Sequence, residues 1–230
     1  MKVAGLQRVT LIDFPGKVAA SIFLAGCNLA CGYCHNHWMI DAAGVTEAIS
    51  VTDLLAWLET RRGLLDGVCI SGGEPTLDPE LPDLIRAIRA MGYLIKLDTN
   101  GTFPRRLEAL LGQRLVDYVA MDVKAPLDDR YASMAGVAIS PEPVRQSMAG
   151  LGAWGGAYEL RTTVGPGLDE AALLDMATEL AVAPRWVLQV FEASDGVLAS
   201  VRQATHLTAE DLTALLPRLQ AIAPRTELRD

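Results

Sequence analysis

Six short apolar runs alternate with six stretches of helical periodicity along this chain, and no other feature limits its fold as strongly. The apolar runs are residues 18–24, 67–70, 93–97, 118–121, 158–162 and 186–191. The helical stretches are residues 52–62, 79–91, 104–111, 141–151, 169–180 and 208–221. Successive strand-then-helix units form a parallel sheet with right-handed crossovers. We therefore expect an α/β fold with a parallel sheet, in the form of either a barrel or an open sheet.

Polar or glycine-rich residues follow each of the six apolar runs. They occupy residues 27–34, 71–75, 98–101, 121–124, 161–167 and 189–192. In parallel α/β sheets and barrels, ligands bind and catalysis occurs at the carboxyl ends of the strands. We therefore expect these residues to form one site.

Three of the four cysteines fall within eight residues, at Cys27, Cys31 and Cys34, in a CxxxCxxC run. A structural zinc site normally needs four ligands, usually as two separated pairs, and no second CxxC pair is present. A disulfide framework needs an even number of well-spread cysteines in a secreted chain. Iron–sulfur clusters usually take four thiolates, so three would leave one iron open for chemistry.

A buried structural role is the alternative for any cysteine, because free cysteine is among the most buried residue types. We assign this role to Cys69, which lies in an apolar run, but not to the three clustered cysteines. His35 and His37 directly follow the cluster and could be auxiliary ligands. We favour solvated or hydrogen-bonded loop histidines.

Composition limits the remaining possibilities. At 230 residues, half of them hydrophobic, the chain can bury one sizeable core, and we expect a single domain over residues 1–230. The net charge of −8 argues against a nucleic-acid groove, although a local basic patch stays possible. No apolar stretch is long enough to span a membrane, and the first residues lack the pattern of a signal peptide. We therefore expect a cytoplasmic protein that binds neither nucleic acid nor membrane.

The glycine-rich turn at residues 71–75 has a chemical interpretation and a structural one. Gly72 and Gly73 allow the backbone to approach a ligand closely, and exposed carbonyls with Glu74 could accept hydrogen bonds from an ammonium group. The alternative is a tight strand-to-helix turn.

Charged residues follow the next strands. Asp98, Thr99 and Asp122 form a possible oxygen-ligand group for a cation or for hydroxyls. Lys124 and Arg161 supply the positive charge that a carboxylate would need, with an ion-paired surface role as the alternative. Asn100 followed by glycine is by itself ordinary turn chemistry.

These motifs together resemble the radical S-adenosylmethionine (SAM) superfamily over nearly the whole chain. The resemblance implies a partial, TIM-like (β/α)6 barrel of parallel strands, which is laterally open because it has six strands rather than eight. The resemblance rests on the CxxxCxxC run with Tyr33 before its third cysteine, on the Gly-Gly-Glu-Pro turn and on the succession of strand-end motifs. Residues 10–16, 34–36, 97–101 and 119–124 are similar to the glycyl-radical-enzyme activases, and most to the short activases of anaerobic ribonucleoside-triphosphate reductase.

The resemblance implies that Cys27, Cys31 and Cys34 hold a 4Fe-4S cluster whose fourth iron binds SAM. Reductive cleavage of SAM would give methionine and a 5′-deoxyadenosyl radical, which takes a hydrogen atom from a glycine of a partner enzyme. The resemblance implies that SAM is bound by Tyr33, Gly72, Gly73, Glu74, Asp98, Thr99, Asn100, Asp122 and Lys124. Arg161 and Gln189 are added mainly because of their positions at strand ends. Asp98, Thr99 and Asp122 also resemble a monovalent-cation site of formate-lyase activases.

The resemblance implies that the partner is a glycyl radical enzyme, and we expect it to be an anaerobic ribonucleotide reductase. Residues 36–66 contain no cysteine for an additional cluster, so an external donor such as flavodoxin or ferredoxin would supply electrons. Two alternatives stay open. One is a radical SAM enzyme for a small molecule, such as 7-carboxy-7-deazaguanine synthase, and the other is a non-catalytic iron–sulfur electron carrier.

Overall fold

The computed structural model describes residues 1–229, and their eight strands form one sheet in the order β1 to β8. The strands are β1 (Val3–Thr10), β2 (Ala19–Leu24), β3 (Gly67–Gly72), β4 (Leu94–Thr99), β5 (Tyr118–Asp122), β6 (Ala157–Val164), β7 (Trp186–Val190) and β8 (Thr226–Arg229). β1 pairs with β2 in antiparallel fashion, and every later neighbour is parallel. β1 and β8 do not pair with each other, so the barrel is open at one side.

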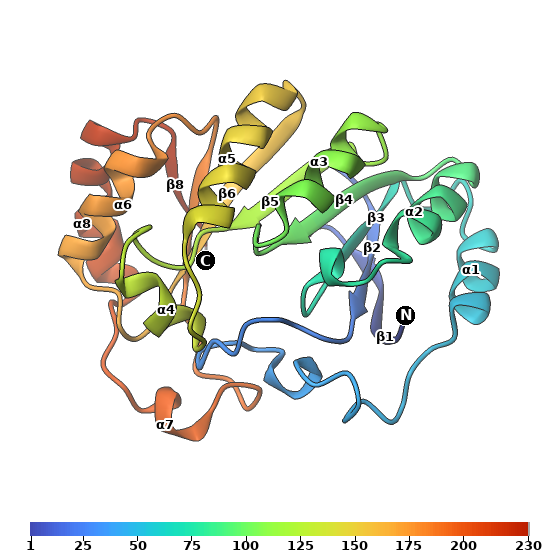
Figure 1. Cartoon of the computed structure of the whole chain (residues 1–230), viewed down its shortest axis with the longest axis horizontal. Coiled ribbons are helices and arrows are strands. Elements are labelled where there is room, and N and C mark those ends of the chain that lie inside the picture. The colour runs from blue at the N-terminus through green and yellow to red at the C-terminus, as the bar shows by residue number, and fades with distance from the viewer. Residues whose placement is uncertain (230) are drawn as a thin grey trace.

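Eight α-helices accompany these strands within the described residues. They are α1 (Val51–Glu59), α2 (Leu81–Ala90), α3 (Pro104–Gly112), α4 (Arg130–Ala135), α5 (Glu142–Trp154), α6 (Glu170–Leu180), α7 (Ala199–Arg202) and α8 (Ala209–Ile222). Two 3-10 turns, η1 (His37–Met39) and η2 (Pro75–Leu77), flank the cysteine run and the glycine turn. Figure 1 shows α1, α2, α3, α5, α6 and α8 following one another around the outside of the sheet. No helix among residues 1–229 is both long and apolar enough to cross a membrane.

The six expected strands are β2 to β7, and the six expected helices are α1, α2, α3, α5, α6 and α8. The sequence analysis missed β1 and β8. β1 is mostly half-buried or exposed, so its sequence has no continuous apolar run. β8 is only four residues long and carries Glu227 and Arg229. Both are edge strands, whose pattern is weaker than that of a strand covered on both faces.

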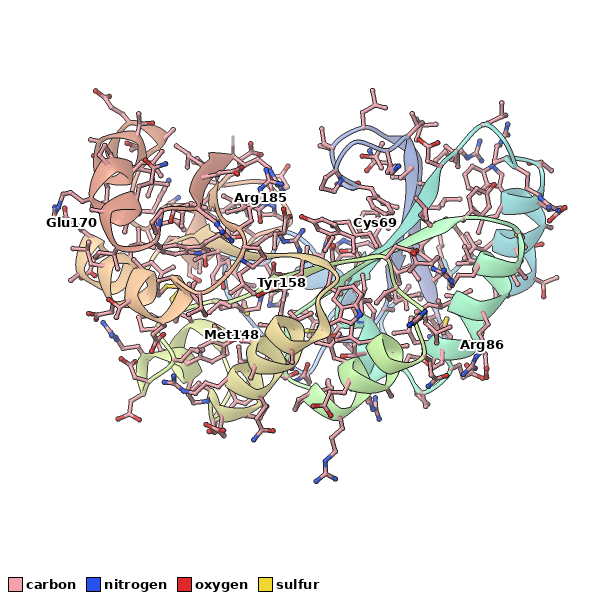
Figure 2. The ribbon with its side chains drawn as sticks, turned by 90° about the horizontal axis from the view of Figure 1, so that it is seen from above. Cys69, Arg86, Met148, Tyr158, Glu170 and Arg185 are labelled. Carbon is pink, nitrogen blue, oxygen red and sulfur yellow. The ribbon has the colours of Figure 1, made fainter. Side chains whose placement is uncertain are left out.

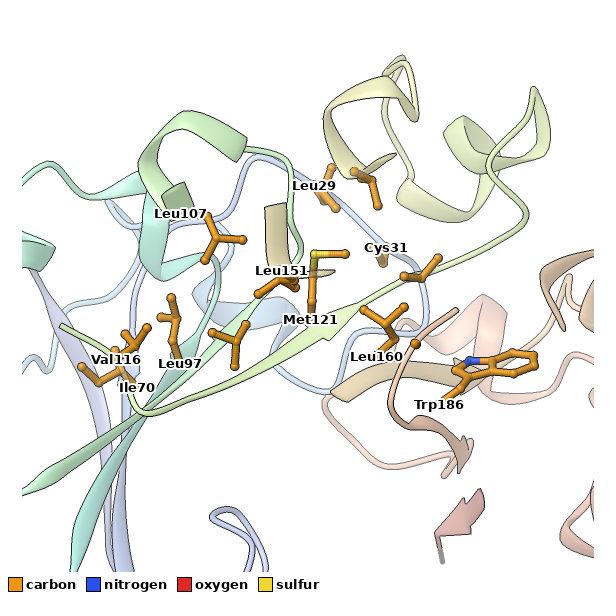
Figure 3. Close-up of a cluster of buried hydrophobic side chains, with 14 of the residues drawn as sticks. Leu29, Cys31, Ile70, Leu97, Leu107, Val116, Met121, Leu151, Leu160 and Trp186 are labelled. Carbon is orange, nitrogen blue, oxygen red and sulfur yellow. The ribbon is translucent and has the colours of Figure 1, made fainter. Parts of the chain in front are cut away.

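Side-chain alternation gives the sheet two chemically different faces. Apolar side chains of the strands pack toward the helices, and Figure 3 shows Ile70, Leu97 and Met121 together with Leu107 of α3 and Leu151 of α5. Successive strand residues point to opposite faces, so their neighbours point inward. The inward residues of β4, β5 and β6 include Lys96, Asp98, Asp122, Glu159 and Arg161. Hydrogen bonds join β5 to β6 and β6 to β4 across the sheet, and Lys96 pairs with Asp98 within β4. The inside of the half-barrel is therefore polar.

Candidate functional site

A cavity of about 370 Å³ lies at the carboxyl ends of the parallel strands. The expected site residues that line it are Cys27, Cys31, Tyr33, Cys34, Gly72, Gly73, Asp98, Thr99, Asn100, Asp122, Lys124, Arg161 and Gln189. Seven further residues line it that the sequence analysis did not select: Asp13, Leu29, His35, Asn36, Ile40, Ser71 and Thr163. Six of the seven lie inside stretches that the sequence analysis names. Ile40 is an ordinary apolar loop residue that carries no sequence signal.

Hydrogen bonds from three directions hold the backbone of the cysteine loop. The amides of Gly26 and Cys27 donate to carbonyls of η1 and of the residue after it, at 2.8 and 3.0 Å. The amide of Ala30 donates to the carbonyl of Ala135 at the end of α4, at 2.9 Å. The amide of Glu74 donates to the Gly26 carbonyl at 2.8 Å. Protein–protein hydrogen bonds thus hold the backbone of the loop in place.

The glycine turn lies directly against the start of this loop. A Cβ atom at Gly73 would lie 2.1 Å from the carbonyl oxygen of Gly26, and one at Gly72 would lie 2.3 Å from the amide nitrogen of Leu24. Gly72 also has φ of +118°, which disfavours a side chain. The two glycines therefore line the cavity, as expected, but contact between two backbones is what requires glycine here.

The thiols of Cys27, Cys31 and Cys34 all belong to residues that line the cavity. Cys31 is buried, whereas Cys27 and Cys34 are partly exposed. Burial raises the pKa of Cys27 to about 11 and also raises the pKa of Cys34. Within residues 1–229, no three His, Cys, Asp or Glu side chains are arranged around one metal-ion position. Thiolates of a cluster bind different iron atoms, so three thiols along one cavity wall fit such a cluster.

Glu74 is the one expected site residue that does not line the cavity. Its side chain is buried outside the cavity, and its carboxylate accepts hydrogen bonds from the amide of Asn100 at 2.6 Å, the hydroxyl of Thr99 at 2.7 Å, and the amide and hydroxyl of Thr76. Burial raises the pKa of Glu74, although these hydrogen bonds act to lower it. The carboxylate therefore joins the glycine turn to the end of β4, and it is not free to bind a ligand ammonium.

Asn100 connects the same strand end to the cysteine loop. Its side-chain amide donates to the side-chain oxygen of Asn28 at 3.1 Å, and its own oxygen accepts from the hydroxyl of Thr102 at 2.6 Å. Asn28 closes the ring by donating to Thr102 at 2.9 Å. The sequence analysis missed Asn28 and Thr102, because neither forms a motif on its own.

A row of alternating charges crosses the cavity floor. Arg161 donates through Nη1 to Asp98 at 3.1 Å and through Nε to Asp122 at 3.0 Å, and Lys124 lies 3.5 Å from Asp122. Burial alone would raise the pKa of Asp98, but Arg161 and the neighbouring Lys96 lower it to about 2. Burial would lower the pKa of Arg161, yet Asp122 and Asp98 raise it. Asp98 and Arg161 therefore both keep their charges at neutral pH.

The segment after β7 covers the far side of the cysteine loop. His35 donates through Nε2 to the carbonyl of Glu192 at 2.9 Å, and a Cβ atom at Gly196 would lie 2.0 Å from the carbonyl oxygen of His35. The preference for a hydrogen-bonded loop histidine is confirmed for His35, although its side chain also reaches the cavity wall. His37 belongs to η1 and does not line the cavity.

Tyr33 lies at the junction between the loop and β6. Its ring packs so close to Gly165 that a Cβ atom there would lie 3.2 Å from Tyr33 Cγ. Its buried hydroxyl has no hydrogen-bond partner among residues 1–229. Packing of the ring against Gly165 therefore fixes the position of Tyr33, which also lines the cavity.

Comparison with known proteins adds family information to this geometry. The model of the Radical SAM superfamily matches residues 21–180. The chain is 34% identical over 203 residues to a Methanocaldococcus jannaschii protein named "Putative glycyl-radical enzyme activating enzyme", covering 84% of this chain and 81% of the relative. It is 35% identical over 143 residues to the pyruvate formate-lyase 1-activating enzyme of Escherichia coli K12, covering 59% and 57%.

A more distant relative is the 7-carboxy-7-deazaguanine synthase of Neisseria meningitidis serogroup B, 33% identical over 116 residues that make up 50% of this chain and 48% of that enzyme. Among solved structures, Streptococcus suis SuiB bound to S-adenosylmethionine superposes with a TM-score of 0.70 at 14% identity, covering 91% of this chain and 51% of SuiB. At that identity the likeness shows the fold alone, and it agrees with the partial barrel.

We predict that Gly73→Ala separates the glycine turn from the cysteine loop, because its Cβ would lie 2.1 Å from a backbone oxygen. The expected loss in free energy of unfolding is about 2–4 kcal/mol, measured by urea denaturation. Gly112→Ala is the control, since its Cβ meets nothing within 4 Å, and it should stay within about 1 kcal/mol of wild type. Equal stability of the two variants would contradict the close backbone contact.

Asp98 should contribute pH-dependent stability. Its pKa of about 2 lies below the ordinary 3.8, a difference worth roughly 2 kcal/mol in free energy of unfolding. Because the native pKa is lowered, this contribution is present above pH 4 and is lost as the pH falls toward 2. Urea denaturation at several pH values should find Asp98→Asn destabilised at pH 7, with the difference shrinking below about pH 4.

Asp175→Asn serves as the control for this prediction, because Asp175 is an exposed partner of Arg130. Its effect at pH 7 should not exceed about 1 kcal/mol. If both variants lose the same small amount of stability, the buried charge row does not stabilise Asp98.

Proposed function

Because the chain belongs to the radical SAM superfamily, we propose that it is the activase of an anaerobic ribonucleoside-triphosphate reductase. The observation that carries this proposal is a single cavity in which three thiols lie beside a row of fixed charges. The similarity to a glycyl-radical activating protein over 84% of the chain supports the activase class. The choice of reductase as partner rests on the short-activase motifs in the sequence.

The residues of the cavity have separate roles in this proposal. Cys27, Cys31 and Cys34 would hold a 4Fe-4S cluster, which supplies the electron that cleaves SAM to methionine and a 5′-deoxyadenosyl radical. Lys124 and Arg161 offer positive charge to the SAM carboxylate, and Asp122 can accept hydrogen bonds from ribose hydroxyls. Their mutual ion pairs hold these groups in place before SAM binds.

The backbone around the cavity completes the site. Gly72, Gly73 and Tyr33 would present carbonyl and amide groups to the amino group and the base of SAM. Glu74 would act through the turn that it holds, since its own oxygens are occupied. Thr99, Asn100 and Gln189 also line the wall, and for Thr99 and Asn100 the side chains are committed to neighbouring protein groups.

The partner's glycine loop would enter through the open side of the barrel. β1 and β8 do not pair, so the sheet leaves a lateral route to its inner face. The connection between β1 and β2 bears the exposed side chains of Leu11 and Ile12, while Asp13 beside them lines the cavity. An exposed apolar tip next to a cavity suits contact with another protein. Electrons would come from a separate flavodoxin or ferredoxin.

A small-molecule radical SAM enzyme of the 7-carboxy-7-deazaguanine synthase type is the second candidate. Its support is a relative that aligns with half of the chain, against 84% for the activating protein. The superfamily match disfavours an electron carrier without SAM chemistry. Such a carrier would also leave the charged residues of the cavity without a ligand to bind.

Single Cys→Ala changes at residues 27, 31 and 34 should each abolish SAM cleavage, because each removes a cluster ligand. After anaerobic reconstitution, iron and sulfide content, the paramagnetic resonance spectrum with and without SAM, and 5′-deoxyadenosine formation would be measured. Cys69→Ala is the control: its thiol is buried away from the cavity, so it should keep the cluster and lose about 1 kcal/mol of stability. Full cleavage activity in any of the three variants would refute the cluster assignment.

Incubation of the reduced protein with SAM and an anaerobic reductase should produce a glycyl radical signal on the reductase, with 5′-deoxyadenosine formed in proportion to radical sites. If SAM is instead consumed catalytically with a pterin-like substrate and the reductase stays silent, the second candidate replaces the first. A glycyl radical that forms only on another glycyl radical enzyme would keep the activase class and reject the named partner.

A further inference from the structure

Lys96 is a buried charge that the proposed function does not use. It lies in the middle of β4 and is 1% exposed. Its ammonium donates to Oδ1 of Asp98 and lies 3.7 Å from the sulfur of Cys69. Figure 2 shows Cys69 within the strand layer, far from the peripheral Arg86 and Glu170. A charged group this deep is tolerated only when it is paired, so its partner Asp98 explains its position.

Asp98, Thr99 and Asp122 are the residues that the sequence suggested as ligands of a monovalent cation. Lys96 already pairs with one of them, Asp98. Oδ1 of Asp98 is taken by Lys96, and Oδ2 accepts from Ser71 and from Arg161, each at 3.1 Å. Asp122 is held by Arg161 and Lys124. No carboxylate oxygen of this pair is left without a positive or hydroxyl partner.

Thr99, the third member of that group, faces the other way. Its hydroxyl donates to Glu74 at 2.7 Å and accepts from the amide of Gly101 at 3.2 Å. Adjacent residues of a strand point to opposite faces, so Thr99 and Asp98 cannot turn both side chains toward one ion. The side-chain oxygens of Asp98, Thr99 and Asp122 therefore do not fit a monovalent-cation site.

The local charge balance leads to the same conclusion. Lys96, Arg161 and Lys124 bring three positive charges to Asp98 and Asp122, which bring two negative charges. A metal cation would add a further positive charge beside a buried ammonium, where like charges repel strongly because the surroundings screen poorly.

We propose that Lys96 is a built-in substitute for a monovalent cation: its ammonium neutralises and orients Asp98, so that SAM binding requires neither K⁺ nor Na⁺. Lys96 acts as a positioning residue, because it holds Asp98 with Oδ2 turned toward Arg161, which lines the cavity. The part of this inference that concerns SAM rests on the proposed function. The part that concerns the cation does not.

The first experiment uses the wild-type chain without cluster or SAM. Thermal midpoints are compared in KCl, NaCl and choline chloride at equal ionic strength. A cation that binds the native state raises the midpoint with its concentration. We expect the three salts to give the same midpoint, and a midpoint that rises with K⁺ or Na⁺ but not with choline overturns the inference, whatever the protein does with SAM.

The second experiment measures SAM binding to the reconstituted enzyme by equilibrium dialysis, in choline chloride and after addition of K⁺ or NH₄⁺. Lys96→Ala removes the ammonium and leaves space, whereas Lys96→Met removes it and fills the space. We expect both variants to bind SAM at least about tenfold more weakly in choline. K⁺ or NH₄⁺ should restore binding to Lys96→Ala only, and wild type should respond to neither ion.

Each other result counts against the inference. Unchanged SAM binding by Lys96→Ala in choline, or a loss that no cation restores, would mean that Lys96 only fills space or supports the fold. Cys69→Ala is the matched control, because it removes the other neighbour of the same ammonium and should leave SAM binding unchanged. Circular dichroism establishes whether each variant is folded. If Lys96→Ala does not fold, the comparison of salts with the wild-type protein decides the inference.

Discussion

The close contact between the glycine turn and the start of the cysteine loop is the constraint on which the rest of the site depends. Gly73 lies against the Gly26 carbonyl with no space for a side chain, and the adjoining amide of Glu74 donates to that same oxygen. Glu74 then reaches across to the end of β4. Three consecutive strand ends are thereby joined by backbone and buried carboxylate, so the thiols take their positions from the sheet rather than from a flexible loop.

The second constraint is the polar inner face of an incomplete barrel. A closed barrel of eight strands fills its interior with branched apolar side chains. Here the inward positions of β4, β5 and β6 carry Lys96, Asp98, Asp122, Glu159 and Arg161, and these residues pair with one another or with neighbouring side chains. Compared with apolar residues of similar volume, such pairs add little stability. They do fix the geometry, because removing one partner leaves a buried charge unpaired and destabilises the protein. Charged groups are thus held in fixed positions at the cavity that we propose binds SAM.

The sequence predicted the central fold because β2 to β7 are apolar runs and their helices have clear periodicity. It predicted most of the cavity lining for a topological reason: residues at the carboxyl ends of parallel strands meet at one edge of the sheet. It could not predict where Glu74 points, because whether a carboxylate faces a ligand or a neighbouring loop depends on contacts from Thr99 and Asn100, which are distant in sequence. Edge strands β1 and β8 were missed for lack of an apolar pattern.

Lys96 marks the limit of pattern-based inference most clearly. In sequence it is one polar residue in a half-apolar run, and such a residue is ordinarily a solvated strand position. Only the structure reveals that its ammonium reaches the same Asp98 that a motif would assign to a cation. A motif fixes which oxygens are present, but neighbouring charges decide what those oxygens can bind. Two proteins that share the Asp98, Thr99 and Asp122 pattern can therefore differ in cation requirement through one buried side chain outside it.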